Sequence, residues 1–329
     1  EHDLREILTY YKEQCALPMS VDDAVTMMKP NYDNYCFSKN KLADCMFNSD
    51  MVLYCMKSLI LHGVKPDEIV DPNIRTDFNK LAYLVRLDHG LGENFSVIKE
   101  IAEQGEIVTE IVTHFSALEM TDVGNFKSLL FYFGLLSIKG VDMMGRPLLH
   151  IPNLVVREQL FNFLIQGYAR HDIFKLDVNR LRTLFENMSF KGDWKPLFEF
   201  LAEAIREQSR IREYIEGEAH IKGFLLAYLS MFRYYQLYPE YEMNKGFADF
   251  FFKPSPAAPV SPPYTYLLEV KYAKAGASEK EIRALADDAR EQLIRYSKDE
   301  CVAEAREKGG LKLATIVWRS WELVLMEEV

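Results

Sequence analysis

The spacing of hydrophobic residues predicts short helices over the first part of the chain. Apolar side chains recur every three or four positions within Leu4–Tyr11, Val21–Met28 and Met51–Leu61, which is the spacing of one buried helix face. Ser20 directly precedes the second of these segments, and acidic residues follow it, as at a capped helix N-terminus. We therefore expect residues 1–88 to form a helical segment.

The middle of the chain, residues 89–205, is predicted to be a helical connector with one extended interruption. Phe126–Leu136 is a strongly apolar helix, Arg146–Asn153 is short and extended, and Val155–Ala169 is a further helix. Pro152 limits the extended segment to a sheet edge or a strand end. A hydrophobic helix, a small hairpin and another helix are also the elements of a winged-helix-like module. Both interpretations of this region, connector and winged-helix-like module, stay open.

Residues 206–329 have a different pattern and form the third predicted domain. The expected elements are a long helix at Glu216–Leu237, strands at Phe247–Phe252 and Tyr264–Tyr272, a helix at Glu279–Ser297, and strands at Leu311–Trp318 and Trp321–Met326. The loop Lys253–Pro263 holds five prolines and is predicted to be the exposed tip of a hairpin. This order predicts a mixed β-sheet flanked by helices, so the fold class is α/β, or α+β over the whole chain.

Composition and charge narrow the classes of function. Hydrophobic residues make up 49% of the 329 positions, yet no apolar run approaches the roughly 20 residues of a membrane-spanning helix. The N-terminus is charged from Glu1 and shows no signal-peptide pattern, so we expect a cytoplasmic protein without a membrane partner. The net charge of −10 argues against binding nucleic acid by electrostatics alone. It does not exclude a nuclease, whose active site must be acidic to hold a metal.

Three ionisable residues of the third domain lie among apolar ones. Glu269 and Lys271 alternate along one predicted strand and so share a face, and Asp249 lies on the neighbouring strand among phenylalanines. A buried carboxylate is costly unless it is paired or binds a cation. Carboxylate oxygens suit Mg²⁺, which polarises a phosphate and activates water, while a nearby lysine stabilises charge. The three residues therefore predict metal-dependent phosphodiester hydrolysis.

Two predicted helices supply further polar candidates. Glu218 shares its helix face with apolar residues and is expected to face them rather than water, which suggests a further metal or water ligand. Gln292 lies at the edge of the apolar stripe of the later helix, one turn before Tyr296. Glu218 is equally understood as a first-turn acid favoured by the helix dipole, with Glu216 as a competitor for its role. Gln292 is equally understood as an ordinary polar helix residue.

The order of these residues resembles the PD-(D/E)XK nuclease superfamily. After the helix acid Glu218, the matching stretches are Gly246–Phe250, Leu267–Tyr272 and Ala289–Tyr296. The sequence departs from the pattern at Ala248, where the motif has proline. More narrowly, the chain resembles bacterial proteins, common in Bacteroides-type genomes, that join an N-terminal AAA-ATPase-like domain to such a nuclease. Phe126–Asn153 is similar to their middle region, and Tyr32–Phe37 is similar to an aromatic turn late in their ATPase-like domain.

The resemblance implies a restriction-endonuclease-like fold and a role for each site residue. Asp249 and Glu269 would hold Mg²⁺ or Mn²⁺, with the backbone carbonyl of Val270 as a third ligand. Lys271 would position the attacking water, and Glu218 and Gln292 would assist. The implied partner is nucleic acid, DNA rather than RNA, and a homodimer would suit an enzyme that cuts both strands.

A catalytically silent nuclease-fold module, serving as a binding or regulatory part of a larger ATPase-linked protein, is the alternative function. With either function, the resemblance implies that residues 1–88 are the C-terminal part of an AAA-ATPase-like domain. The chain contains no Gly-x-x-x-x-Gly-Lys-Ser/Thr loop to cradle phosphates. We therefore expect the phosphate-binding part of the ATPase domain to be missing from this chain. The Glu269–Lys271 pair would in this alternative be an ordinary ion pair on a sheet edge.

Overall fold

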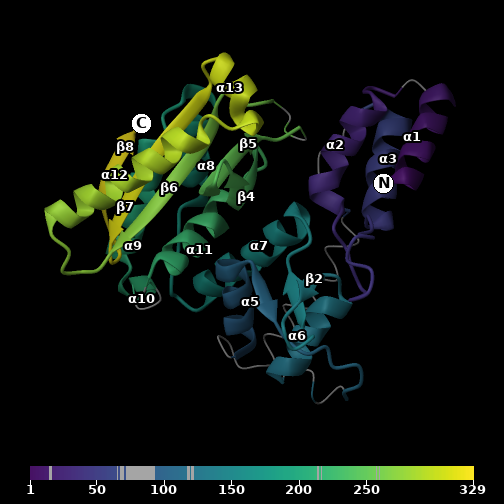
Figure 1. Ribbon diagram of the computed structural model, residues 1–329, viewed down its shortest axis with the longest axis horizontal. Helices are drawn as coiled ribbons and strands as arrows, with labels where there is room; N and C mark the ends of the chain where they lie inside the picture. Colours follow the sequence, from purple (N-terminus) through teal and green to yellow (C-terminus); the bar gives the residue numbers. More distant parts are fainter. Residues whose placement is uncertain are drawn as a thin grey trace. The chain divides into compact units, whose positions relative to one another are not determined.

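The chain divides into two compact units, Glu1–Gly167 and Tyr168–Val329 (Figure 1). The computed structural model describes residues 1–14, 17–64, 66, 70–71, 93–116, 119, 122–212, 215, 217–256, 258 and 260–329. Across these residues, every helix is too short or too polar to cross a membrane. Each unit has its own buried apolar core and is described separately.

The first unit begins with three helices that confirm the predicted ones. They are α1 (His2–Gln14), α2 (Val21–Tyr32) and α3 (Ser49–His62). The hydroxyl of Ser20 accepts a hydrogen bond from the Asp23 amide at 3.0 Å and so caps α2, as expected for a serine at this position. The part of the expected helical segment from 72 to 88 lies outside the described residues.

The rest of the first unit combines helices with a small sheet. Its elements are α5 (Glu93–Gln104), β1 (Glu106–Val108), α6 (Val123–Tyr132), β2 (Ser137–Val141), β3 (Pro147–His150) and α7 (Leu154–Arg170). The strands pair antiparallel in the order β1-β3-β2. The expected helix at Phe126–Leu136 ends earlier, at Tyr132, because Gly134 adopts a left-handed conformation with φ of 70°. The winged-helix-like interpretation stays a prediction.

The second unit is built on a mixed five-stranded sheet flanked by helices. Its elements are α8 (Val178–Lys191), α9 (Lys195–Glu207), α10 (Ser209–Arg212), α11 (Glu218–Leu229), β4 (Tyr235–Met243), β5 (Gly246–Pro254), β6 (Thr265–Ala273), α12 (Glu279–Tyr296), η2 (Glu300–Val302), α13 (Ala303–Glu307), β7 (Leu311–Arg319) and β8 (Glu322–Glu328). The order is β4-β5-β6-β7-β8, and β6 and β7 are the parallel pair. This architecture confirms the predicted α/β class and a restriction-endonuclease-like sheet.

One predicted element is wrong. The helix expected over Glu216–Leu237 ends at Leu229, and the residues from Tyr235 onward form β4 instead. Pro239 lies within this strand and is tolerated because β4 is at the edge of the sheet. Glu216 lies outside the described residues.

Helices cover both faces of the sheet, with α12 on one face and α8 and α9 on the other (Figure 1). On the second face, the Tyr266 hydroxyl donates to the Met188 carbonyl at 2.6 Å, and the Trp194 indole donates to Glu328 at 3.4 Å. Helices α8 and α9, expected in the connector 89–205, therefore lie in the second unit. The unit boundary differs from the expected boundaries after 88 and 205, and the division into three domains stays a prediction.

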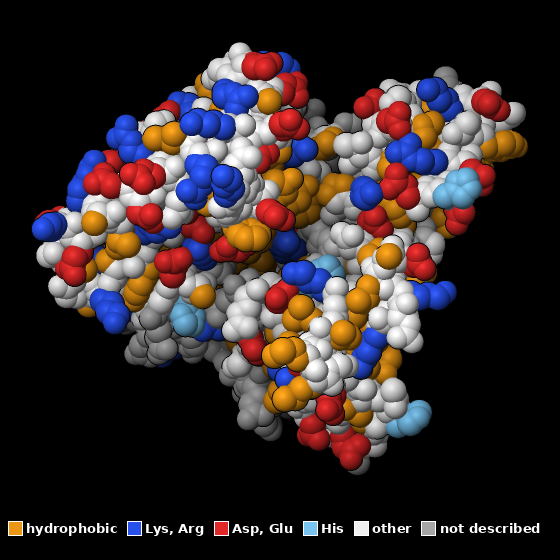
Figure 2. Space-filling view, in the orientation of Figure 1, with side chains coloured by type: hydrophobic (Ala, Val, Ile, Leu, Met, Phe, Trp, Pro, Cys, Tyr) orange, Lys and Arg blue, Asp and Glu red, His pale blue; other side chains and the backbone are white. Residues whose placement is uncertain are grey.

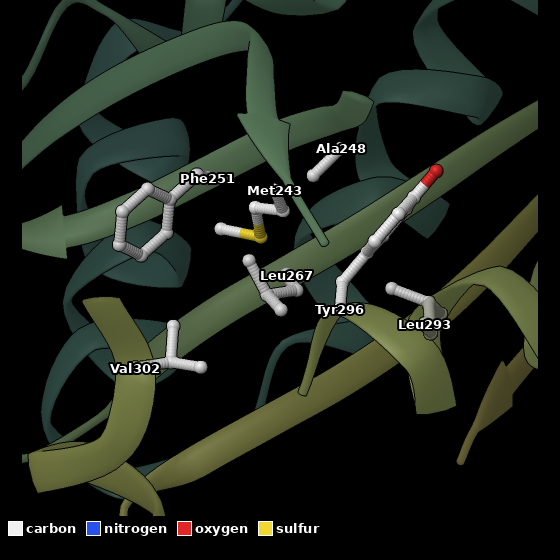
Figure 3. Packing of buried hydrophobic residues seen from close by; sticks show 7 residues of the cluster. All are labelled: Met243, Ala248, Phe251, Leu267, Leu293, Tyr296 and Val302. Atoms are coloured by element: carbon white, nitrogen blue, oxygen red, sulfur yellow. The ribbon is translucent and has the colours of Figure 1, made fainter. Parts of the chain in front are cut away.

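A hydrophobic cluster on the α12 side fixes this helix against β5 and β6. Its buried members are Met243, Ala248, Phe251, Leu267, Leu293, Tyr296 and Val302 (Figure 3). Gly246, the first residue of β5, lies against Tyr296 so closely that a Cβ atom there would be 2.3 Å from the tyrosine hydroxyl oxygen. The glycine and the tyrosine of the recognised motifs thus have a packing role that sets the distance between α12 and β5.

The loop predicted over Lys253–Pro263 begins later, because Lys253 and Pro254 are the last residues of β5 and pair with β4. The rest of the proline-rich segment joins the antiparallel strands β5 and β6, which confirms a hairpin connection. The loop was predicted to be exposed, and the structure differs. Ser255 and Ala258 are buried, so the described part of the loop is only partly open to solvent.

Candidate active site

The site lies where β5 and β6 move apart. Their paired residues run from Phe252–Tyr266 to Phe250–Leu268, and past this point side chains replace the backbone ladder. Glu269 Oε1 accepts a hydrogen bond from the Asp249 amide at 3.2 Å. Asp249 Oδ2 accepts one from the Val270 amide at 2.8 Å. Each carboxylate is therefore held by the backbone of the opposite strand.

Both carboxylates are buried and lie side by side. Asp249 is 5% exposed and Glu269 is 1% exposed. Burial raises the pKa of Glu269 above its ordinary value, and the negative charge of Asp249 raises that pKa further, whereas Lys271 opposes the shift. Two like charges in a space shielded from water favour uptake of a proton or a cation. The pair is thus suited chemically to bind a positive ion.

Lys271 and Gln292, both predicted site residues, are brought together beside Glu269. The Lys271 ammonium lies 3.4 Å from Glu269 Oε2 and donates to Gln292 Oε1 at 3.0 Å. The amide of Gln292 in turn donates to Asp288 Oδ2 at 2.8 Å. Asp288, one turn earlier on α12 and also 3.5 Å from the Lys271 ammonium, was missed by the sequence reasoning.

Lys222 on α11 is the second missed residue, and it touches Asp249 directly. Its ammonium lies 2.5 Å from Asp249 Oδ1, 2.8 Å from Glu218 Oε1 and 3.3 Å from Glu240 Oε1. Burial acts to lower the pKa of Lys222, but the surrounding carboxylates outweigh it and raise that pKa above its ordinary value. The side chain is 18% exposed, so this is a largely buried ammonium among three carboxylates.

The expectation that Glu218 faces the apolar stripe of its helix is wrong. Its side chain is 43% exposed and is paired with Lys222. The cause is the start of the helix: α11 begins at Glu218, so this side chain lies in the first turn. It is joined to Asp249 through Lys222.

We call Lys222, Asp249, Glu269, Lys271 and Gln292 the ion-pair row. Four of its members were predicted from the sequence. Lys222 had a detectable signal, since it lies four residues after Glu218 and directly before the apolar run Gly223–Leu229. Glu240 had none, because its strand β4 was not predicted: a helix was expected up to Leu237 and the next strand only from Phe247.

The oxygen donors of the ion-pair row suit a divalent metal. Within the described residues there is no group of three or more His, Cys, Asp or Glu side chains placed to hold a metal ion. Asp249 and Glu269 form a pair, with the backbone of Val270 bonded to Asp249. Hard oxygen donors, burial and the raised Glu269 pKa fit a divalent cation bound by two carboxylates and completed by backbone oxygen or water.

Comparison with known families agrees with this geometry. A family model described as PD-(D/E)XK nuclease superfamily matches residues 216–328, a stretch that includes α11 and the whole sheet of the second unit. None of the curated proteins matches the chain. The resemblance to the superfamily is thereby confirmed for the C-terminal segment. The AAA-ATPase-like N-terminal domain and the bacterial, Bacteroides-type affiliation stay predictions.

Proposed function

We propose that the second unit is a divalent-metal-dependent nuclease whose substrate is DNA rather than RNA. The observation that carries the proposal is the ion-pair row: two adjoining buried carboxylates with a lysine on each side, at the divergence of two strands. It lies within the segment that matches a nuclease superfamily, and this match supports a phosphodiester hydrolase in general. The choice of DNA rests on the family resemblance.

Asp249 and Glu269 would hold Mg²⁺ or Mn²⁺, with the carbonyl of Val270 as a third ligand. When bound, the ion polarises the scissile phosphate and lowers the pKa of a coordinated water. The hydrogen bonds from the Asp249 and Val270 amides hold both carboxylates in place before the ion arrives. Such preorganisation favours binding because little order is lost on association.

Lys271 would act on the reacting groups. Its ammonium is anchored by Gln292 and lies beside Glu269, and a lysine has three N–H donors. A remaining donor can hydrogen-bond the attacking water or a non-bridging phosphate oxygen as negative charge develops. Gln292 would orient Lys271, and Asp288 holds the Gln292 amide from the other side.

The charge distribution favours phosphate binding by a few groups at the site rather than by a broad basic surface. Figure 2 shows basic and acidic side chains interspersed over the part of the surface that α12 occupies, and the whole chain carries a net charge of −10. Phosphate neutralisation would therefore depend on the bound ion and on Lys271 more than on a broad basic surface. From the family resemblance we further infer a homodimer for cutting both strands and an ATPase domain outside this chain.

The proposal is tested by calorimetric titration of Mn²⁺ together with plasmid cleavage on the same samples. Asp249→Asn should lose Mn²⁺ binding and cleavage, whereas Lys271→Met should bind the ion and lose cleavage. Asp287→Asn is the matched control, because Asp287 is an exposed carboxylate of α12 paired with Arg283. Cleavage that persists in both site variants, or without any metal, would overturn the proposal.

A catalytically silent binding or regulatory module is the second candidate. The observation that favours it is the Lys222 ammonium, which lies 2.5 Å from Asp249 Oδ1 and neutralises a carboxylate that would otherwise hold the metal. This candidate predicts a folded chain that binds nucleic acid without cutting DNA or RNA in the presence of Mg²⁺ or Mn²⁺. Cleavage lost in Asp249→Asn would exclude it.

A further inference from the structure

The two oxygens of Asp249 have different partners. Oδ2 accepts the amide of Val270 at 2.8 Å, and Oδ1 accepts the ammonium of Lys222 at 2.5 Å. The oxygen that is not engaged by the backbone is thus the one that Lys222 contacts. A metal ion that binds this oxygen and the ammonium would be two cations in one place, and their repulsion in a buried site is strong.

We propose that Lys222 is a tethered cation that competes with the divalent metal for Asp249. Glu218 and Glu240 hold its ammonium after the metal has displaced it. The proposal rests on the proposed function, because it takes Asp249 as a metal ligand. It gives Glu218 a different role from the metal or water ligand expected from the sequence.

The carboxylates around Lys222 offer its ammonium two positions, one against Asp249 and one between Glu218 and Glu240. The three N–H donors of a lysine are matched by one carboxylate from each of three elements: Glu218 on α11, Glu240 on β4 and Asp249 on β5. Glu218 and Glu240 have side chains 43% and 60% exposed, whereas that of Asp249 is 7% exposed. The buried partner attracts the ammonium most in the absence of metal. When a metal ion binds Asp249, the two exposed partners, Glu218 and Glu240, still accept the ammonium.

The competition has a structural benefit for the metal-free protein. An uncompensated buried carboxylate is strongly destabilising, and the Lys222 ammonium reduces that cost at Asp249. The same contact must be given up when the metal binds, so it lowers metal affinity. Lys222 therefore lowers the affinity of Asp249 for the metal and stabilises the folded protein when no metal is bound.

The test is calorimetric titration of Mn²⁺ into the full chain, with thermal unfolding in a chelator measured in parallel. Lys222→Met should bind Mn²⁺ about tenfold tighter than wild type or more and should unfold at a lower temperature in the chelator. Lys222→Arg, which keeps the charge, should stay close to wild type in both measurements. Lys312→Met is the matched control, because Lys312 pairs with Glu328 and its Cα partner is Tyr266, on the other face of the sheet.

The outcomes separate this inference from the proposed function. Binding lost in Asp249→Asn and strengthened in Lys222→Met supports both. Wild-type binding with equal or weaker binding by a folded Lys222→Met overturns the competition and leaves the nuclease proposal standing. Absence of binding in wild type and in Lys222→Met overturns both.

A second variant covers the case in which Lys222→Met does not fold without metal. Glu240→Gln changes an exposed side chain and removes one of the two acceptors that would hold the displaced ammonium. Its Mn²⁺ affinity should fall severalfold, because the displaced state of Lys222 becomes less favourable. An affinity equal to that of wild type would contradict the role given to Glu240.

Discussion

At the scale of single residues, each of the two buried carboxylates is paired with a lysine, and the two lysines come from opposite ends of the ion-pair row. Lys222 reaches Asp249 from α11, and Lys271 reaches Glu269 along its own strand. The alternation of strand side chains was enough to predict that Glu269 and Lys271 share a face. The contact of Lys222 with Asp249 joins two elements far apart in the sequence, and no local pattern encodes such a pairing.

The raised pKa of Glu269 predicts a pH dependence of stability in the metal-free protein. The folded state keeps the Glu269 proton at pH values where the unfolded chain has released it, so this contribution to stability is fully present below the ordinary pKa of 4.5. It is lost as the pH rises from there toward the raised pKa of the folded state. The slope from this one group is at most about 1.4 kcal/mol per pH unit.

Denaturant unfolding in a chelator at a series of pH values checks this dependence. Glu269→Gln has no proton to release and should remove this part of the slope. Saturating Mn²⁺ should restore stability at the higher pH values, since the ion replaces the proton between the carboxylates. A slope that is the same in wild type and in Glu269→Gln would show that another group is responsible.

Gln292 should affect catalysis rather than metal binding. Gln292→Ala frees the Lys271 ammonium from its 3.0 Å hydrogen bond, and loss of one such positioning contact should lower the cleavage rate about tenfold or more. The Mn²⁺ affinity should change by less than about twofold, because Gln292 contacts neither carboxylate of the pair. Single-turnover cleavage and calorimetry measure the two effects, with the exposed neighbour Glu291 changed to alanine as the control.

At the scale of elements, the sequence predicted the strands that surround the site better than the edge strand beside it. β5, β6, β7 and α12 follow their expected ranges closely, because the three strands are short apolar runs and α12 has a helical pattern. β4 was missed because its sequence contains Pro239 and polar residues and follows a strongly apolar helix. The pairing with β5 decides its structure, and pairing depends on residues distant in the sequence.

The close packing of Gly246 against Tyr296 predicts a large effect of a small substitution. Gly246→Ala should destabilise the protein by about 1–3 kcal/mol, since the new methyl group would lie 2.3 Å from the tyrosine hydroxyl oxygen. Gly276→Ala is the matched control, because no atom lies within 4 Å of its added Cβ. Chemical denaturation measures both variants.

The coupling between the two residues can be measured as well. Tyr296→Phe removes the nearest clashing atom and should recover part of the loss in the double variant. Equal stability of Gly246→Ala and Gly276→Ala would show that α12 shifts away from β5 at little cost.

At the scale of the whole molecule, the second unit contains the complete ion-pair row, the sheet and both covering layers of helices. The sequence placed the start of the nuclease domain at residue 206, whereas α8 and α9 pack on the sheet face opposite the site. Their packing contacts, such as Trp194 with Glu328, are between residues distant in the chain, so periodicity could not assign these helices to a domain.

A fragment of residues 168–329 should therefore fold by itself. It should unfold cooperatively in denaturant, and its Mn²⁺ affinity should agree with that of the full chain within about threefold. A fragment that begins at residue 206, the boundary expected from the sequence, should be poorly folded, because it exposes the aromatic sheet face that α8 and α9 cover. If the fragment 168–329 fails to fold, the compact units do not correspond to independent domains.

The replacement of ladder bonds by Asp249 and Glu269 has a consequence for how such a site can change during evolution. The carboxylates that would hold the metal also tie β5 to β6, so a substitution that removes either acid also loosens the sheet. A lineage under no selection for cleavage would still retain these acids for the sake of folding, until a compensating change closed the gap between the strands. A silent descendant of a nuclease could thus keep its full set of acids, and their presence alone is a weaker sign of activity than the measured response to metal.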